Sequence, residues 1–290
     1  MKILLLGKTG QVGFELHRTL SPLGAITAPG REQLDLNNEQ AVTDYLVQAK
    51  PDLIVNAAAY TAVDAAEENH KAAQRLNADL PKQLAQYAVA KKARLVHYSS
   101  DYVYPGTGSV PWQEASTIGP LSVYGETKLE GDQAIQQSGC EHLIFRTSWV
   151  YSARGNNFLK TMLRLAQSKP ELNIVADQIG APTPARLIAQ VTTLAIHSQL
   201  AIGLYHLAPK GGTSWHGFAQ EIFRQAQESG EQLSMGAEDA KPIPTSDYPT
   251  PATRPLNSRM DVTKLETALN IQLLDWRAEL SLTLNEFLEK

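Results

Sequence analysis

The sequence predicts an α/β fold in which a doubly wound parallel sheet is covered by helices on both faces and carries a smaller C-terminal region. Short apolar runs alternate with segments of helical periodicity through the first half of the chain, a pattern typical of parallel sheets. A glycine-rich turn also follows the first apolar run directly, where such sheets bind their ligands. Together these two observations favour this fold class over an all-α or all-β one.

The apolar runs correspond to the expected strands, and the segments between them to the expected helices. Two of the runs, LIV at 53–55 and LVHY at 95–98, are apolar along most of their length, as strands buried on both sides are. In chain order we expect a strand at 2–7, a helix at 11–20, a strand at 25–28, a helix at 38–49, a strand at 52–59, a helix at 71–90, and strands at 94–100 and 142–148.

Composition excludes several classes of function. The 290 residues are 43% hydrophobic and 19% charged with a net charge of -4, which argues against nucleic acid or an anionic membrane as a partner. No apolar run is long enough for a membrane span, and no signal peptide is evident, so a cytoplasmic protein is expected. The single Cys140 excludes an internal disulfide, and the seven scattered histidines lack metal-ligand spacing, so no metal site is predicted.

Glycines at Gly7, Gly10 and Gly13 form a G-x-x-G-x-x-G motif after the first strand. In a strand–turn–helix unit these glycines allow a tight turn, close approach of backbone N–H groups to a pyrophosphate, and close packing of helix on strand. The motif predicts a Rossmann-type dinucleotide site, with the pyrophosphate at the helix start formed by Gly10, Gln11 and Val12. In isolation, a glycine turn opening any other α/β protein would look the same.

The end of the second strand distinguishes NAD from NADP. NAD sites usually place an acidic residue there for the ribose 2′-OH, whereas a basic residue accommodates a 2′-phosphate. Arg31 lies near this place, so NADPH is the expected cofactor and NADH the alternative; a solvated loop arginine is the competing interpretation. Asp35 and Leu36 are expected to border the adenine. The other predicted cofactor contacts follow the third strand or end the fourth: Ala59, Tyr60, Thr61 and Tyr98.

Tyr124 and Lys128 lie four residues apart after the fourth strand, in the stretch VYGETK. At helical spacing, i and i+4 project from one face. Lys128 is therefore expected to lower the pKa of the Tyr124 phenol for proton transfer and to reach the nicotinamide ribose. Ser100 ends the fourth strand, where parallel sheets bind ligands, and is expected to hydrogen-bond the same substrate oxygen.

The same spacing recurs at Tyr87 and Lys91, so spacing alone does not identify a proton donor. Tyr87 falls in the helix before the fourth strand, towards the opposite edge of the sheet. A packed tyrosine and a solvated lysine are expected there. Position in the fold therefore selects Tyr124 and Lys128 as the catalytic pair.

Regular alternation ends near Trp149, and proline-rich stretches such as KPIPTSDYPTPATRP follow. We expect 1–149 to form the dinucleotide-binding domain, 150–183 and 201–290 to form the substrate-binding region, and a helix at 184–200 to return to the first domain. Arg254 lies among prolines and is expected to bind a diphosphate, because a guanidinium pairs bidentately with phosphate oxygens. A loop arginine paired with a local acid is the competing interpretation.

Nine motifs occur in order over essentially the whole chain: GKTGQVG, NAAAYTAVD, HYSSDYVYPGTG, VYGETKLEG, FRTSWVY, GNNF, DQIGAPTPA, YHLAP and YPTPATRPLNSRM. Together they resemble the dTDP-4-dehydrorhamnose reductases, a family of extended short-chain dehydrogenase/reductases. The resemblance implies reduction of the C4 ketone of dTDP-4-dehydro-L-rhamnose with NAD(P)H, the last step of dTDP-L-rhamnose biosynthesis. It also implies that Tyr124 is the acid, Lys128 its partner and Ser100 the adjacent hydroxyl, while Asp101 and Trp149 contact the nucleotide sugar. Asn157 is expected to contact sugar or base, although such asparagines are as often turns or caps.

Several positions depart from patterns of the resembled families. Ser100 stands where threonine is usual, which keeps the hydroxyl. Tyr102 stands where related nucleotide-sugar dehydratases use a second acid, which favours simple reduction. Glu15 is present, but Arg186 stands where metal-bridged dimeric members place an acid. A monomer or weak homodimer without that metal is therefore expected.

Two other functions are open on the sequence alone. The β subunit of methionine adenosyltransferase, a regulatory subunit that binds NADP without needing turnover, is similar in fold and motifs. Intact Ser100, Tyr124 and Lys128 weigh against it, because a binding module needs no proton donor beside the nicotinamide. A reductase of another nucleotide-activated deoxysugar would share the chemistry and differ in pocket shape alone.

Overall fold

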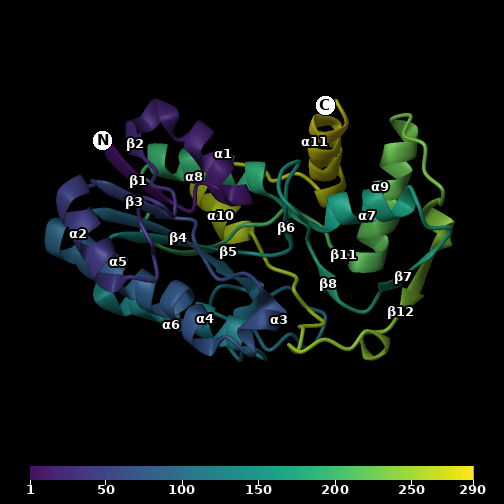
Figure 1. The fold of residues 1–290 in the computed structure, drawn as a ribbon, viewed down its shortest axis with the longest axis horizontal. Helices are drawn as coiled ribbons and strands as arrows, with labels where there is room; N and C mark the ends of the chain where they lie inside the picture. The colour runs from purple at the N-terminus through teal and green to yellow at the C-terminus, as the bar shows by residue number, and fades with distance from the viewer. Residues whose placement is uncertain (290) are drawn as a thin grey trace.

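The computed structural model describes residues 1–289 and has a six-stranded sheet at its centre (Figure 1). In order across the sheet, the strands are β10 (Gly203–His206), β5 (His142–Thr147), β4 (Arg94–Ser100), β3 (Leu53–Asn56), β1 (Lys2–Leu6) and β2 (Ala25–Thr27). All five pairings are parallel. The chain order reverses between β1 and β3, so the ligand-binding crevice of such a sheet is expected at their carboxyl ends.

Helices cover both faces of the sheet (Figure 1). One face carries α1 (Gln11–Thr19), α8 (Ala185–His197) and α10 (Thr263–Leu269), and the other carries α2 (Glu39–Ala49), α5 (Leu80–Lys91) and α6 (Val123–Ser138). Ile3 and Leu5 of β1 pack in the core under α1 and α8, whereas Leu4 and Leu6 pack in the core under α2, α5 and α6. Both sides of the strand are buried, which explains its continuous apolar sequence. The predicted doubly wound α/β fold is confirmed.

Short elements connect this sheet to its helices. They are η1 (Ser21–Leu23), α3 (Val63–Ala66), α4 (His70–Gln74), the π-helical turn η2 (Arg75–Asp79) and the 3₁₀ turn η3 (Asp101–Val103). The turn η2 leads from α4 into α5 and lies against α6. The contact is closest at Gly131, where an added Cβ would lie 2.1 Å from the backbone oxygen of Asn77.

A second, smaller region has its own core. Its elements are β6 (Val150–Tyr151), α7 (Phe158–Ala166), β7 (Leu172–Val175), β8 (Ile179–Gly180), β9 (Thr183–Pro184), β11 (Thr213–Ser214), α9 (Trp215–Glu228), η4 (Ala237–Asp239), β12 (Ala240–Ile243), η5 (Thr245–Asp247) and α11 (Trp276–Leu288). Strand pairs β6–β9, β7–β12 and β8–β11 link segments distant in sequence. Aromatic and aliphatic side chains of α7, α9 and α11 form the core, including Phe218, Phe223 and Trp276.

The division between the two regions differs from the predicted boundaries in one place. Helix α8 packs on α1. However, β10 then pairs with β5 in the main sheet, and Leu265 of α10 packs into the same core. Parts of 201–290 therefore belong with the first domain, because they extend the sheet by one strand and cover it. The four residues of β10 are too few for their sequence to show this.

Cys140, the single cysteine of the sequence, lies just before β5. Cys140 is 3% exposed and packs in the core under α5 and α6, as an ordinary small residue ahead of a strand would. Burial raises the pKa of its thiol, which favours the neutral form.

Within residues 1–289, no helix combines the length and the apolar character needed to cross a membrane.

We predict that Gly131→Ala destabilises the protein. Alanine normally favours a helix interior over glycine by up to about 1 kcal/mol. Here the added Cβ would lie 2.1 Å from backbone, so α6 and η2 would have to separate. We expect a net loss of about 1–3 kcal/mol in the free energy of unfolding, measured by urea denaturation.

The control is Gly217→Ala in α9, where the nearest atom to an added Cβ is the Thr213 hydroxyl oxygen at 2.5 Å. A side-chain oxygen can rotate away, so the loss should be smaller there. If Gly131→Ala were as stable as the wild type, the close packing of α6 on η2 would not be a real constraint.

Candidate active site

The turn after β1 needs glycine at two positions for steric reasons. Gly7 has a φ of +83°, in the left-handed region that favours glycine, and an added Cβ would lie 2.7 Å from the backbone of Ala57 and Ala58. At Gly13, an added Cβ would lie 2.0 Å from the Gly7 oxygen. Helix α1 therefore packs directly on the turn, as the motif predicts.

The start of α1 fits the pyrophosphate of a dinucleotide. Gly10 is the N-cap residue and has no side chain that could accept a hydrogen bond. The first N–H groups of the helix therefore have no capping acceptor. An added Cβ at Gly10 would meet only the Gly7 oxygen, at 3.4 Å, so the space before the helix is open. Uncapped N–H groups at the positive end of a helix dipole bind phosphate groups. Gln11 and Val12 follow Gly10 at this helix start.

The turn after β2 holds the residues predicted for the adenine end. Arg31 is exposed, in keeping with either predicted interpretation. Asp35 accepts hydrogen bonds from the backbone and side chain of Asn37, at 3.0 and 2.9 Å, and these bonds lower the pKa of its carboxyl group. The backbone oxygen of Leu36 accepts from Arg75 Nε at 3.0 Å. Arg75 thus anchors this turn to η2.

The segment after β3 is held by an asparagine that the sequence reasoning did not single out. Asn77 Oδ1 accepts from the Tyr60 N–H at 2.8 Å, and Asn77 Nδ2 donates to the Tyr60 carbonyl at 3.1 Å and to Thr127 Oγ1 at 3.2 Å. Asn77 is fully buried. It therefore ties Ala59, Tyr60 and Thr61 to α6. The stretch RLNADL contains two other polar residues, Arg75 and Asp79, so its sequence gave no signal that singles out Asn77.

Ser100 and Tyr124 belong to adjacent elements at the carboxyl end of the sheet. Ser100 is the last residue of β4, and its Oγ accepts from the Tyr102 N–H at 3.2 Å and donates to Asp101 Oδ1 at 3.0 Å. Tyr124 lies in the first turn of α6, whose N-cap Ser122 accepts from the Gly125 N–H at 3.2 Å. Burial raises the pKa of the Tyr124 phenol, and the Ser100 hydroxyl acts in the opposite direction.

The protonation of Tyr124 differs from the expectation. Burial raises the pKa of its phenol, and the nearby charge of Asp101 acts in the same direction. Lys128 does not lower it here, because Lys128 Nζ instead donates to the Tyr98 carbonyl at 2.6 Å and lies 3.3 Å from His97 Nε2. The expectation of a lowered phenol pKa is therefore wrong for the protein without ligand. The phenol is held in its neutral, proton-donating form.

Lys128 and Asp132 extend the series begun by Tyr124 along one face of α6. Lys128 is 1% exposed; burial lowers its pKa to about 8, while Asp132 raises it. Asp132 Oδ2 accepts from Ser99 Oγ at 2.9 Å and pairs with Arg146 Nε at 3.0 Å. This buried ion pair was not predicted. Its signal was the repeated i, i+4 spacing.

The polar layer under the site continues beyond Arg146. Arg146 Nη1 donates to Tyr104 Oη at 2.8 Å, and Tyr104 Oη lies 2.6 Å from His206 Nε2. The other ring nitrogen of His206 lies 3.0 Å from the Asp261 carbonyl oxygen. Burial, followed by the charge of Arg146, lowers the pKa of His206 to about 3, so its ring is neutral. Strands β4, β5 and β10 are thus tied together below the site.

Two other tyrosines occupy the positions that their packing favours. The Tyr98 side chain points to the α8 face, where its hydroxyl lies 2.9 Å from Thr192 Oγ1. Only its backbone carbonyl faces Lys128, so a cofactor contact of Tyr98 would have to come from that side of the strand. Tyr87 packs on the opposite face, in the core under α5, and Lys91 is exposed. That pair lies away from the carboxyl ends, as predicted.

The site also contains Asp101, Tyr102 and Arg254, of which Asp101 is buried and Arg254 is partly exposed. Asp101 is 1% exposed; burial raises the pKa of its carboxyl group to about 6, and its Oδ2 has no hydrogen-bond partner among the described residues. The Tyr102 ring packs edge-on against Tyr124, with centroids 5.3 Å apart. Arg254 Nη1 donates to Tyr102 Oη at 3.1 Å, and its Nη2 pairs with Asp64 at 2.7 Å. The local acid foreseen in the competing interpretation is therefore present.

Trp149 combines an unfavourable backbone conformation with close aromatic stacking. Its φ of +49° is uncommon for a bulky residue. Its ring stacks on Trp215 with centroids 3.7 Å apart, and the Trp215 ring packs against Phe158 at 4.8 Å. Trp215 Nε1 donates to Gln178 Oε1 at 3.0 Å. These partly exposed rings form an aromatic wall on the second region.

Asn157 serves as a cap in this structure. Its Oδ1 accepts from the Lys160 N–H at 3.2 Å at the start of α7. Its Nδ2 donates to Gln11 Oε1 at 2.8 Å and to the Ser152 carbonyl at 2.7 Å. The residue thus joins the second region to the first turn of α1. A substrate contact of Asn157 stays a prediction.

Arg186 forms ion pairs between the two regions. It contacts Glu15 of α1 at 3.4 Å and Glu286 of α11 at 2.8 Å. Its guanidinium thus supplies the positive charge between these two carboxylates. No group of three or more His, Cys, Asp or Glu side chains within residues 1–289 is arranged to hold a metal ion.

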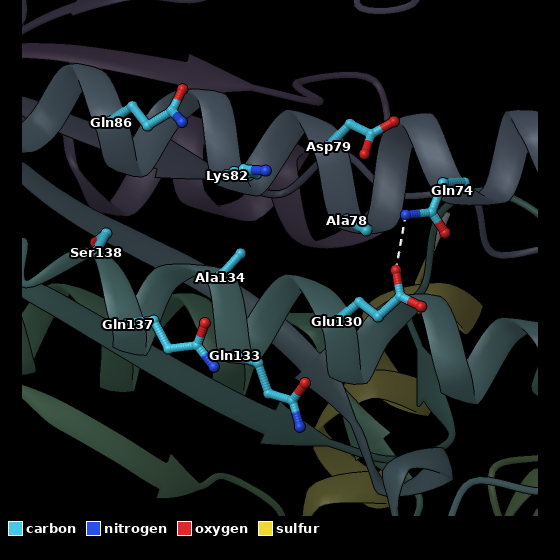
Figure 2. Close-up of a pocket in the computed structure, with 10 residues that line it drawn as sticks. All are labelled: Gln74, Ala78, Asp79, Lys82, Gln86, Glu130, Gln133, Ala134, Gln137 and Ser138. Atoms are coloured by element: carbon cyan, nitrogen blue, oxygen red, sulfur yellow. Dashed lines mark hydrogen bonds between the residues drawn. The ribbon is translucent and has the colours of Figure 1, made fainter.

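A polar groove of about 390 Å³ lies elsewhere, between η2, α5 and α6 (Figure 2). Gln74 Nε2 donates to Glu130 Oε2 across it at 2.7 Å. Its lining includes none of the predicted site residues. We therefore assign the active site to the strand ends and not to this groove, whose lining is Gln74, Ala78, Asp79, Lys82, Gln86, Glu130, Gln133, Ala134, Gln137 and Ser138.

Comparison with known proteins places the chain in a family. The family model described as "RmlD substrate binding domain" matches residues 1–289. A dTDP-4-dehydrorhamnose reductase of Shigella flexneri is 47% identical over 99% of this chain and 98% of its own. The solved structure of a dTDP-4-dehydrorhamnose reductase from Clostridium acetobutylicum has a TM-score of 0.91 at 34% identity and covers both chains completely.

A second solved structure bears on the cofactor. The dTDP-4-dehydrorhamnose reductase of Bacillus anthracis, determined in complex with NADP, has a TM-score of 0.89 at 32% identity and covers 98% of this chain and 99% of its own. The agreement thus extends over nearly the whole chain. The chain belongs to the dTDP-4-dehydrorhamnose reductase family.

Proposed function

We propose that this protein reduces the C4 ketone of dTDP-4-dehydro-L-rhamnose to dTDP-L-rhamnose with NADPH. The observation that carries the proposal is the position of Ser100 at the end of β4 and of Tyr124 and Lys128 in the first two turns of α6. The chain is also 47% identical to a dTDP-4-dehydrorhamnose reductase. The NADP complex of the Bacillus anthracis relative and the open glycine turn support the choice of cofactor.

The bound reduced nicotinamide supplies hydride to the ketone carbon. Tyr124 gives its proton to the oxygen that develops negative charge, because its raised pKa keeps the phenol protonated. Ser100 donates a hydrogen bond to the same oxygen. This requires its hydroxyl to turn away from Asp101 Oδ1, its present acceptor at 3.0 Å. Lys128, in its ammonium form, supports the tyrosinate that remains after proton transfer.

The second region and the loop around Arg254 are assigned to the nucleotide diphosphate. Arg254 is 25% exposed at its side chain and is held by Asp64 and Tyr102, so its guanidinium is positioned before a phosphate arrives. The Trp149–Trp215 pair offers an aromatic surface for the sugar or base. Because Arg186 already bridges Glu15 and Glu286, we infer a monomer or weak homodimer that needs no bridging metal.

We predict that Tyr124→Phe lowers kcat by about 10²–10⁴-fold, the usual contribution of a general acid. Cofactor affinity should change little, because the hydroxyl is needed only for proton transfer. The measurement is loss of reduced-nicotinamide absorbance with NADPH and dTDP-4-dehydro-L-rhamnose, together with NADPH binding followed by fluorescence.

The matched control is Tyr87→Phe, which alters the other tyrosine that precedes a lysine by four residues, and it should turn over normally. Turnover by Tyr124→Phe within a few-fold of the wild type would remove Tyr124 from its role. A wild type that binds NADPH tightly but reduces no nucleotide sugar would favour a regulatory subunit instead.

We predict that Arg254→Gln raises KM for the nucleotide sugar by about tenfold or more, because a hydrogen bond to a charged group contributes about 1.5–3 kcal/mol. The effect on kcat should be smaller. Arg277→Gln is the control, since Arg277 is an exposed arginine of the same region that pairs with Asp275 at 3.6 Å. An unchanged KM in Arg254→Gln would show that Arg254 only fastens its loop to Asp64.

A further inference from the structure

Two buried polar side chains, Asn56 and His97, form a row of contacts that ends at Lys128. The proposed reaction does not use these two residues. Asn56 ends β3 and His97 lies on β4, at paired positions of the two strands. Asn56 Nδ2 is 3.1 Å from His97 Nδ1, and His97 Nε2 is 3.3 Å from Lys128 Nζ. All three residues are 1% exposed. Buried polar groups at such distances are expected to be hydrogen-bonded in a defined direction.

The backbone sets that direction. The Ala58 N–H donates to Asn56 Oδ1 at 3.3 Å, which makes Oδ1 the acceptor and turns Nδ2 towards the imidazole. An amide nitrogen donates and does not accept, so His97 Nδ1 is the acceptor of this pair. Burial, followed by the charge of Lys128, holds the pKa of His97 well below its usual value, so the ring is neutral. The proton of a neutral ring then resides on Nε2, which faces Lys128.

Lys128 Nζ lies 3.3 Å from His97 Nε2, within reach of this N–H. It already donates to the Tyr98 carbonyl at 2.6 Å. A neutral amine has a lone pair that can accept from His97 Nε2–H, whereas an ammonium has only donors. We propose that His97 is a positioning residue for Lys128: Asn56 fixes its ring in the Nε2–H tautomer, and that N–H favours the neutral amine of Lys128 over the ammonium.

The other groups around Lys128 act in both directions. Asp132, one turn further along α6, favours the ammonium, but its charge is shared with Arg146 of β5 at 3.0 Å. Tyr124, one turn earlier on α6, is neutral. Burial favours the amine and brings the pKa of Lys128 to about 8. The N–H of His97 acts in the same direction as burial, so Lys128 can gain or lose a proton near neutral pH.

This row of contacts also connects Lys128 to the glycine turn. The backbone N–H of Ala58 donates to Asn56 Oδ1. Ala58 also borders Gly7, because a Cβ on Gly7 would lie 2.7 Å from that nitrogen. If Lys128 becomes an ammonium and donates to His97 Nε2, the ring must carry its proton on Nδ1 and the Asn56 amide must turn over. The Ala58 N–H then loses its acceptor. Protonation of Lys128 is thereby coupled to the backbone beside the dinucleotide turn.

The test is nitrogen NMR of the full-length, ligand-free protein labelled with ¹⁵N-histidine, with the His97 signals identified by their loss in His97→Gln. Above pH 8, the wild type should show the proton of His97 on Nε2. Its ring signals should also shift in a step near the pKa of Lys128, which is about 8. The experiment needs neither cofactor nor substrate, so it is independent of the proposed reduction.

Asn56→Ala removes the donor that selects the tautomer. The ring can then accept from the ammonium, so the step should move upward by about one pH unit. Thr192→Val, which alters a buried hydroxyl on the opposite side of β4, should leave the step in place. A wild-type proton on Nδ1 above pH 8, or an unmoved step in Asn56→Ala, would overturn the proposal. The wild-type tautomer decides it alone if Asn56→Ala does not fold.

Discussion

The site depends on one buried interaction, the 2.6 Å hydrogen bond from Lys128 Nζ to the Tyr98 carbonyl. A lysine that is 1% exposed must find polar partners, because an unpaired amine or ammonium in the interior is costly. The bond therefore fixes α6 against the end of β4. It also places Tyr124, one turn earlier, beside Ser100 at the end of that strand. The reactive hydroxyls are thus positioned by a group that lies beneath them.

Close backbone packing makes this arrangement possible. Gly131 lets α6 approach the carbonyl of Asn77, and Asn77 in turn holds the Tyr60 backbone on both its N–H and its carbonyl. The Asp132–Arg146 pair joins the same helix to β5. Helix α6 is consequently tied to β4, to β5 and, through Asn77, to the segment that follows β3. We infer that the chemistry is rigidly held while the nucleotide sugar is received by the second region.

The second region reaches the crevice through the proline-rich C-terminal loop. Asn257 N–H donates to the Gly106 carbonyl at 2.9 Å, and Ser258 N–H donates to the Ile179 carbonyl at 2.7 Å. Segments on both sides of the site are therefore joined by this loop. Arg254 lies within it and contacts Tyr102, whose ring packs on Tyr124. A substrate bound at Arg254 would thus be one ring away from the proton donor.

Features that depend on local spacing could be predicted from the sequence. Examples are the glycine turn, the Tyr124–Lys128 pair and the end of β4. Each involves residues close in sequence and needs only the assumption of a parallel sheet. The partners of Lys128 could not be predicted, because His97 and Tyr98 lie 31 and 30 residues away in the sequence and reach Lys128 only through tertiary packing. The prediction that the pKa of Tyr124 is lowered was wrong for the same reason, because burial and the contacts of Lys128 depend on the tertiary structure. Asn157 shows a third limit, because a cap and a ligand contact look alike in sequence.

The most direct measurement is the fate of deuterium carried at the nicotinamide C4 of NADPH during turnover with dTDP-4-dehydro-L-rhamnose. One of the two stereospecifically labelled forms should deliver deuterium to C4 of the product sugar, seen as loss of that proton signal in the NMR spectrum. A product without deuterium at C4 from either form, or no product from a protein saturated with NADPH, would contradict the assignment of this site to ketone reduction.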